Sequence, residues 1–269
     1  MKIVVCIPAR YASTRFPAKV LAKDTGKYLI QHTWEQARRA RLPERVVIAA
    51  DDEKIVRAAR VFGAECVLTS TAHQSGTDRI AEAVGHSDAD IVINVQGDEP
   101  QIDPAHIDYL ARLLLDHPEA PMATLATGFA SREQILDPNV VKVVIADGGL
   151  GMADSRPADA SRPAPAARAI YFSRSVIPYD RERAGVGDVG HYLRHIGIYA
   201  YRRDFLLRIT ALPQTRLEKL EKLEQLRALE NGFAILVGKV EHTCEGIDTP
   251  EQYAAFVKRQ ASKDRKGQS

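Results

Sequence analysis

Three permanently charged side chains stand close together near the start of the chain. Arg10, Arg15 and Lys19 lie within ten residues, with Ser13 between them. Three cations in one loop favour a polyphosphate ligand, because guanidinium and ammonium groups bind phosphate oxygens strongly. Neither the G-x-G-x-x-G nor the G-x-x-x-x-G-K-[ST] phosphate-binding pattern occurs in the sequence. On these residues alone, the segment is either a phosphate-binding loop or an ordinary solvated basic loop.

Two acidic residues are candidate metal ligands. Asp98 follows a predicted buried strand at residues 91–95, and Gly97 before it would let the backbone turn tightly. Asp248 precedes Thr249, from which the next helix already receives its cap. Magnesium takes one or two carboxylates and completes its shell with phosphate oxygens and water. Asp98 could instead cap a turn, and Asp248 could simply interact with a helix dipole.

A second polar loop, residues 73–79 (H-Q-S-G-T-D-R), follows the third predicted strand. It could read the edge of a nucleobase or be an ordinary connection between a strand and a helix. His195 has an alternative interpretation as a core histidine. Three further cations could be surface charges: Lys142, Arg174 and Arg194.

The first part of the chain alternates between strand and helix patterns. The apolar run at residues 3–7 predicts a strand buried on both faces, which Pro8 ends because it has no N–H. The alternation predicts a doubly wound, mostly parallel sheet of the α/β class, with ligands at the carboxyl ends of the strands. The predicted strands are residues 3–7, 45–50, 65–69 and 91–95, and the helices are residues 28–41, 53–62, 78–84 and 104–116.

The second part has a different pattern. Residues 148–168 are rich in Gly, Pro, Ala, Ser and Asp and predict an exposed, mobile loop. Leucines recur at every third position over residues 217–229, which predicts a helix that packs against two surfaces, such as its own sheet and a partner subunit. The predicted strands are residues 122–127, 140–146, 169–172, 195–201 and 234–237, and a last helix opens at Thr249.

Composition excludes several classes of protein. The 269 residues carry a formal net charge of +2, and the cations are spread among nearly as many acids, which argues against a nucleic-acid partner. No stretch approaches the roughly 20 apolar residues of a membrane span, and the N-terminal apolar run is too short for a secretory signal. Three widely separated cysteines indicate buried, reduced thiols. These features predict a cytoplasmic protein without a membrane partner.

Eight motifs, in the same order and over nearly the whole chain, resemble those of the CMP-Kdo synthetases, the 3-deoxy-manno-octulosonate cytidylyltransferases. In this sequence they read I-P-A-R-Y-A-S-T-R-F-P-A-K, H-Q-S-G-T-D-R, V-I-N-V-Q-G-D-E-P, P-N-V-V-K-V-V, Y-F-S-R-S-V-I-P-Y-D-R, L-R-H-I-G-I-Y-A-Y, L-E-Q-L-R and G-I-D-T-P-E.

The resemblance implies a nucleotidyltransferase-like, Rossmann-type three-layer sandwich, with a smaller mixed sheet and a helix in the second half. It implies a homodimer and a Mg²⁺-dependent transfer of CMP from CTP to a Kdo-type sugar acid. We expect a single domain over residues 1–269, with a nucleotide-binding half (1–120), a sugar-binding and dimerisation half (121–260) and a flexible tail (261–269).

The resemblance also assigns residues to roles. Catalysis would rest on Arg10, Lys19 and Asp98, and the metal on Asp98 and Asp248. The sugar acid would contact Gln96, Arg174, His195 and Glu221. The nucleotide would contact Pro8, Ala9, Arg10, Arg15, Lys19, His73, Gln74, Ser75, Gly76, Arg79 and Gln96.

The sequence departs from the family pattern after the second arginine of the basic loop. Ala18 and Val20 stand where the family usually has glycine and proline, while Lys19 is kept. Two alternatives therefore stay open. One is a cytidylyltransferase for a related sugar acid, 8-amino-Kdo or a sialic acid, and the other is a non-catalytic nucleotide-binding protein.

Overall fold

The computed structural model describes residues 1–13, 15–146, 167–244 and 246–266. The chain forms two compact units, one of Met1–Asp108 and Cys244–Ser269, the other of Tyr109–Thr243. This division differs from the predicted halves 1–120 and 121–260, because the last part of the chain returns to the first unit. That the whole chain is one domain stays a prediction.

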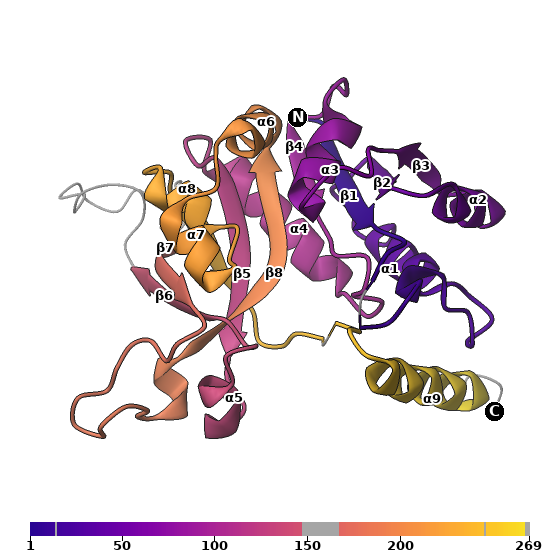
Figure 1. Ribbon diagram of the computed structural model, residues 1–269. Helices are drawn as coiled ribbons and strands as arrows, with labels where there is room; N and C mark the ends of the chain where they lie inside the picture. The colour runs from indigo at the N-terminus through magenta and orange to yellow at the C-terminus, as the bar shows by residue number, and fades with distance from the viewer. Residues whose placement is uncertain (14, 147–166, 245, 267–269) are drawn as a thin grey trace. The chain divides into compact units, whose positions relative to one another are not determined.

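Parallel strands form the sheet of the first unit, in the order β3-β2-β1-β4 (Figure 1). The apolar run predicted at residues 3–7 is buried within β1, where Val5 lies opposite Val46 on one side and Ile93 on the other. The parallel, doubly wound prediction is therefore confirmed. The strands are β1 (Ile3–Ala9), β2 (Arg45–Ala50), β3 (Glu65–Leu68) and β4 (Ile91–Asn94).

The strand order fixes where a ligand can bind. The chain steps from β1 to β2 to β3 in one direction and then returns to the other side of β1 with β4. The strand order therefore reverses between β1 and β4. Because the crossovers are right-handed, α1 and α2 cover one face of this sheet and α3 covers the other. Ligands bind at the carboxyl ends of strands at such a point. The helices of this unit are η1 (Lys19–Leu21), α1 (Leu29–Ala37), α2 (Glu53–Val61), α3 (Gly76–Val84), α9 (Pro250–Lys266) and the first turns of α4 (Pro104–Asp116).

Pro8 lies inside β1, although the sequence predicted that it ends the strand. The ladder with β4 stops at Cys6, which pairs with Asn94, while the ladder with β2 continues to Ala9. Beyond Cys6 a missing N–H therefore costs no hydrogen bond to β4, and a proline is tolerated there.

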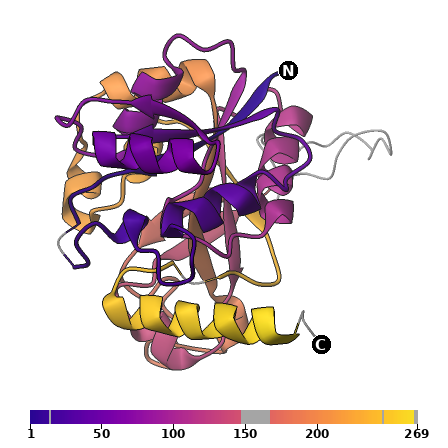
Figure 2. The ribbon, with the colours of Figure 1, turned by 90° about the vertical axis from the view of Figure 1, so that its right-hand side faces the viewer.

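The C-terminal helix α9 lies beside α1 in both views (Figures 1 and 2). Phe256 and Tyr253 of α9 share an apolar cluster with Leu29 of α1. The predicted cap is confirmed, since Thr249 and Gln252 exchange hydrogen bonds of 3.0 and 3.3 Å. Residues 261–266 of the predicted tail are helical, because α9 continues through good helix formers such as Ala, Lys and Arg. That the tail is flexible stays a prediction.

In the second unit the paired strands form a continuous ring, from β5 through β9, β7, β6 and β8 back to β5. β5 pairs with β8 and β9, β9 with β7, β7 with β6, and β6 with β8; only the β5–β9 ladder is parallel. This is the smaller mixed sheet that the resemblance implies. The elements are β5 (Met122–Gly128), α5 (Arg132–Leu136), β6 (Lys142–Ala146), β7 (Ala167–Ser173), η2 (Val189–His191), β8 (Leu193–Arg202), α6 (Arg203–Ala211), α7 (Arg216–Glu221), α8 (Leu226–Glu230) and β9 (Ile235–Lys239).

The leucine-rich segment is two short helices, and the prediction of one continuous helix over residues 217–229 is wrong. Lys222 has a left-handed backbone (φ 53°) and ends α7. A buried ion pair between Glu218 and Arg227, 2.6 Å apart, then holds α7 against α8. As a result Leu223 is buried while Leu220 is 69% exposed.

Three further predictions can be compared with the structure. Of the predicted loop at residues 148–168, the last two residues already belong to β7, and the remainder lies outside the described residues. Cys6 is buried, as expected, and burial raises the pKa of its thiol to about 12, but Cys244 is exposed. Among the described residues, no helix combines the length and apolarity needed to cross a lipid bilayer.

Candidate active site

A pocket of about 340 Å³ lies at the carboxyl ends of β1 and β4, where the topology of the first unit predicts a ligand site. All eleven predicted nucleotide-binding residues line it, together with Asp98 and Asp248. Four permanent cations face two carboxylates in this lining, which suits a polyanionic ligand. No role was predicted for three other lining residues, Ser13, Val20 and Gly97, although Ser13 lies in the basic loop and Gly97 precedes Asp98.

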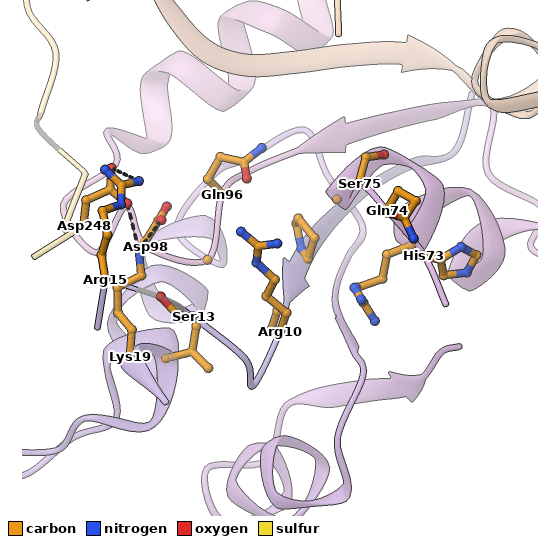
Figure 3. A pocket seen from close by; sticks show the side chains of 16 residues that line it. Arg10, Ser13, Arg15, Lys19, His73, Gln74, Ser75, Gln96, Asp98 and Asp248 are labelled. Atoms are coloured by element: carbon orange, nitrogen blue, oxygen red, sulfur yellow. Dashed lines mark hydrogen bonds and ion pairs between the residues drawn. The ribbon is translucent and has the colours of Figure 1, made fainter. Parts of the chain in front are cut away.

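One side of the pocket is a cluster of charges around Lys19 (Figure 3). The ammonium Nζ of Lys19 lies 2.7 Å from Oδ2 of Asp98 and 3.0 Å from Oδ1 of Asp248, and the Lys19 side chain is only 9% exposed. Arg15 reaches the other oxygen of Asp248 at 3.2 Å. Two acids 150 residues apart in sequence therefore meet at one cation. Asp248 is not the side-chain cap of α9, since that helix receives its cap from Thr249.

The backbone before Lys19 has a left-handed conformation. Ala18 has φ 53° and ψ 26°, and its carbonyl accepts the N–H of Leu21 at 2.8 Å. This conformation is unfavourable for an L-residue because its Cβ approaches the following carbonyl, which explains why glycine suits the position. Ala18 thus keeps the turn that aims Lys19 at the acids, at some cost in backbone strain.

We expect Ala18→Gly to preserve turnover and to leave stability equal or up to about 1 kcal/mol higher, because relief of the left-handed strain is offset by glycine's larger unfolded-state entropy. Ala18→Val should destabilise by about 1 kcal/mol or more, since a β-branched residue at positive φ is an outlier. Urea unfolding and turnover of both variants measure this. A glycine variant that is clearly less stable than the parent would contradict the argument.

The opposite wall is the loop before α3. Ser75 caps α3 by accepting the N–H of Asp78 at 3.1 Å, so the helix starts at Gly76, two residues earlier than predicted. His73 pairs through Nε2 with Glu82. The backbone N–H of Ser70 and then His73 hold the pKa of Glu82 below its usual range. In the view of Figure 3, Arg10 lies between this wall and the cluster around Lys19.

Glycines let these walls come close to β1. A Cβ on Gly97 would lie 2.9 Å from the carbonyl oxygen of Pro8 and 3.0 Å from Ile30, and a Cβ on Gly76 would lie 3.3 Å from the Pro8 ring. Gly97 thus allows close packing, and it also lies in the tight turn that the sequence predicted, which the N–H of Glu99 closes on the carbonyl of Gln96 at 3.2 Å. Beside it, the Gln96 amide donates to Asn94 at 3.2 Å.

Three of the four predicted sugar-binding residues belong to the second unit, whereas Gln96 belongs to the first. Glu221 accepts hydrogen bonds from the Ser173 hydroxyl at 2.6 Å and from the backbone N–H of Arg174 at 2.9 Å. The Arg174 guanidinium donates to the carbonyl of Glu221 at 2.6 Å and to two further backbone carbonyls. The structure therefore brings Arg174 and Glu221 together at the end of β7.

His195 lies in the interior of the second unit. Its Nε2 is 3.0 Å from the Thr124 hydroxyl, and its ring packs edge-on against Phe172. Burial lowers its pKa to about 3, so the imidazole is neutral. These contacts match the alternative interpretation of His195 as a core histidine. Lys142, considered as a surface charge, is instead fully buried on β6 and donates to two backbone carbonyls.

A pocket for a polyanion at the switch point of a parallel sheet is typical of a nucleotide-binding protein. A comparison with family models identifies which class of nucleotide-binding protein this is. Residues 4–240 match the family model described as cytidylyltransferase. A curated 3-deoxy-manno-octulosonate cytidylyltransferase from Rhodopirellula baltica is 46% identical over 266 residues, covering 96% of this chain and 98% of that protein. Its counterpart from Geobacter sulfurreducens is 44% identical, covering 96% of this chain and 99% of that protein.

Solved structures agree. A CMP:2-keto-3-deoxy-manno-octonic acid synthetase complexed with CTP is 38% identical, with a TM-score of 0.85, over 98% of this chain and all of that chain. A 4-diphosphocytidyl-2C-methyl-D-erythritol synthase from Anaerococcus prevotii, 12% identical with a TM-score of 0.61, shares the fold alone. The chain belongs to the 3-deoxy-manno-octulosonate cytidylyltransferase family.

Proposed function

We propose that this protein transfers CMP from CTP to the anomeric hydroxyl of Kdo and releases pyrophosphate, the activation step that precedes lipopolysaccharide synthesis. The observation that carries the proposal is the pocket at β1 and β4, whose lining contains every residue that the sequence assigned to the nucleotide. The full-length family membership supports it. Because the donor is a nucleoside triphosphate, we place the reaction in the cytoplasm.

The chemistry needs no protein nucleophile. The sugar hydroxyl attacks the α-phosphorus in line and releases its proton to solvent. The new bond joins the sugar oxygen to the α-phosphorus, and the bond from that phosphorus to the bridging oxygen of pyrophosphate breaks. Catalysis of such a transfer consists of positioning the reactants and neutralising charge. In this proposal Arg10, Arg15 and Lys19 bind the triphosphate, and the loop at residues 73–76 contacts cytosine.

Magnesium fits the acids of the pocket. Hard carboxylate oxygens are the ligands it prefers, and Asp98 and Asp248 already converge on a single cation, the ammonium of Lys19. In this proposal these two acids hold the ion. When bound, it would neutralise charge on the phosphates.

The second unit offers groups for the sugar acid. Lys142 and Arg174 direct their charges at backbone carbonyls, and Glu221 is the carboxylate beside them. Asp137 is a second acid near Lys142, and the guanidinium of Arg174 is the permanent cation that suits the carboxylate of a Kdo-type sugar. We assign this contact to Arg174, with Glu221 holding it in place and with Gln96 and His195 as further sugar-pocket residues.

An assay of pyrophosphate release tests the proposal. CTP and Mg²⁺ are incubated with Kdo, 8-amino-Kdo and a sialic acid in parallel, and Kdo should give the highest kcat/KM. A preference for another sugar acid would support the related cytidylyltransferase. No pyrophosphate with any of the three, in protein that binds CTP, would support a non-catalytic nucleotide-binding protein.

We further propose a homodimer formed through the second unit. Apolar side chains remain exposed there on α7 and β7, where Leu220 is 69% and Ile170 is 55% exposed. Light scattering at micromolar concentration should give a dimer, and Leu220→Glu should shift it toward monomer. Val61→Glu is a matched control, because Val61 is equally exposed, at 74%, but lies on α2 of the first unit. A monomeric parent protein would overturn the proposal.

A further inference from the structure

Asp51, the first residue after β2, joins the basic loop to α3. Its Oδ1 accepts the backbone N–H of Tyr11 at 2.8 Å, and its Oδ2 accepts Nη2 of Arg79 at 3.2 Å. Its own backbone N–H donates to the carbonyl of Ala9 at 3.3 Å. Tyr11 directly follows Arg10, while Arg79 lies in the first turn of α3. One carboxylate therefore links segments on two sides of the pocket.

The other donors of Arg79 extend this network to β3. Nη1 of Arg79 donates to the Thr69 hydroxyl at 2.8 Å and to the Ser70 carbonyl at 3.4 Å. The Thr69 hydroxyl in turn donates to the carbonyl of Ala50, the last residue of β2, at 2.9 Å. The network thus connects the carboxyl ends of three parallel strands with the start of α3.

Burial makes this network rigid. The side chains of Arg79 and Asp51 are 5% and 13% exposed. A buried charge is stable only with its partner and its hydrogen bonds in place, so neither group can move freely. Arg79 lines the pocket, whereas Asp51 and Thr69 do not. Since the guanidinium of Arg79 donates hydrogen bonds to protein groups, its first role is to hold the pocket wall in place.

We propose that Asp51 is a positioning residue for the nucleotide. Through Tyr11 it fixes the loop that carries Arg10, and through Arg79 it fixes the loop that carries residues 73–76. The segments that bind the phosphates and the base are then correctly placed before CTP arrives. Such preorganisation removes an ordering cost from binding. The inference rests on the proposed function only in naming CTP as the nucleotide.

Asp51→Asn tests this, because asparagine has nearly the same shape but lacks the charge that holds Arg79. We expect calorimetry to give CTP binding about tenfold weaker, by analogy with metal sites, where losing a residue that orients a ligand costs about tenfold or more. The KM for CTP should rise with it, while the KM for Kdo stays the same. A residue that only stabilised the fold would lower the melting temperature without this selective loss.

Two further variants keep the test decisive if Asp51→Asn folds poorly. Thr69→Val removes the hydroxyl that Arg79 uses, at a position outside the pocket lining, and should weaken CTP binding in the same direction. Asp52→Asn is the control, because Asp52 caps α2 and asparagine caps equally well. Unchanged CTP affinity in both Asp51→Asn and Thr69→Val would overturn the proposal, as would a parent that binds no CTP. A parent that binds CTP but turns over no Kdo would refute the proposed function alone.

Discussion

Asp98→Asn and Asp248→Asn should each lower turnover about a hundredfold or more, because each removes a charge from the position where the two acids meet. Both carboxylates contact the same ammonium, so a divalent cation there would lose a ligand in either variant. Residues that act as a unit are strongly non-additive. The double variant should therefore be little worse than either single one, and raised Mg²⁺ should partly restore each single variant.

Metal binding can be measured separately from turnover. Binding of Mn²⁺ to the protein with CTP, followed by paramagnetic resonance, should weaken in both variants, while circular dichroism shows an intact fold. Asp116→Asn, at an exposed acid at the end of α4, is the control and should bind Mn²⁺ like the parent. If Asp248→Asn keeps near-normal turnover at low Mg²⁺, the ion depends on Asp98 and the phosphates alone, and the role given to Asp248 is wrong.

Much of this pocket could be predicted because its residues come from local patterns with a fixed structural meaning. A continuous apolar run indicates a strand buried on both faces, and the residues just after a parallel strand lie at the ligand edge of the sheet. That argument places Arg10 after β1 and Asp98 after β4. Because Thr249 is the cap of α9, the carboxylate of Asp248 is available for another role, and in the structure it contacts Lys19.

Other features depend on contacts between distant segments, which no local pattern contains. Lys222 has a left-handed backbone between α7 and α8, and a buried ion pair between Glu218 and Arg227 links these two helices, so a leucine repeat that predicts one helix forms two. Pro8 fits inside β1 only because β4 is short. The role of the Asp51 carboxylate is likewise absent from any local pattern, because its partners Tyr11 and Arg79 are 40 and 28 residues away.

Replacing Lys19 should lower turnover more than CTP affinity. The Lys19 ammonium is held by two carboxylates with its side chain 9% exposed, so a cation is fixed in the pocket before any substrate arrives. Preorganised charge acts most strongly where charge develops, here on the departing pyrophosphate, and losing one such group costs about a hundredfold or more in turnover. CTP affinity should fall less, because Arg10 and Arg15 remain in the lining.

Lys19→Met is the sharper variant, since methionine keeps the packing of the aliphatic stem and removes only the charge. Single-turnover rates and calorimetric CTP affinities separate the two effects, and Lys23→Ala, an exposed lysine four residues later and outside the pocket lining, is the control. Asp98 and Asp248 are 31% and 45% exposed, so water can solvate both acids and the variant should fold. A loss confined to CTP affinity would make Lys19 a clamp for bound nucleotide, because an interaction equally strong in ground and transition states leaves the rate of the bound complex unchanged.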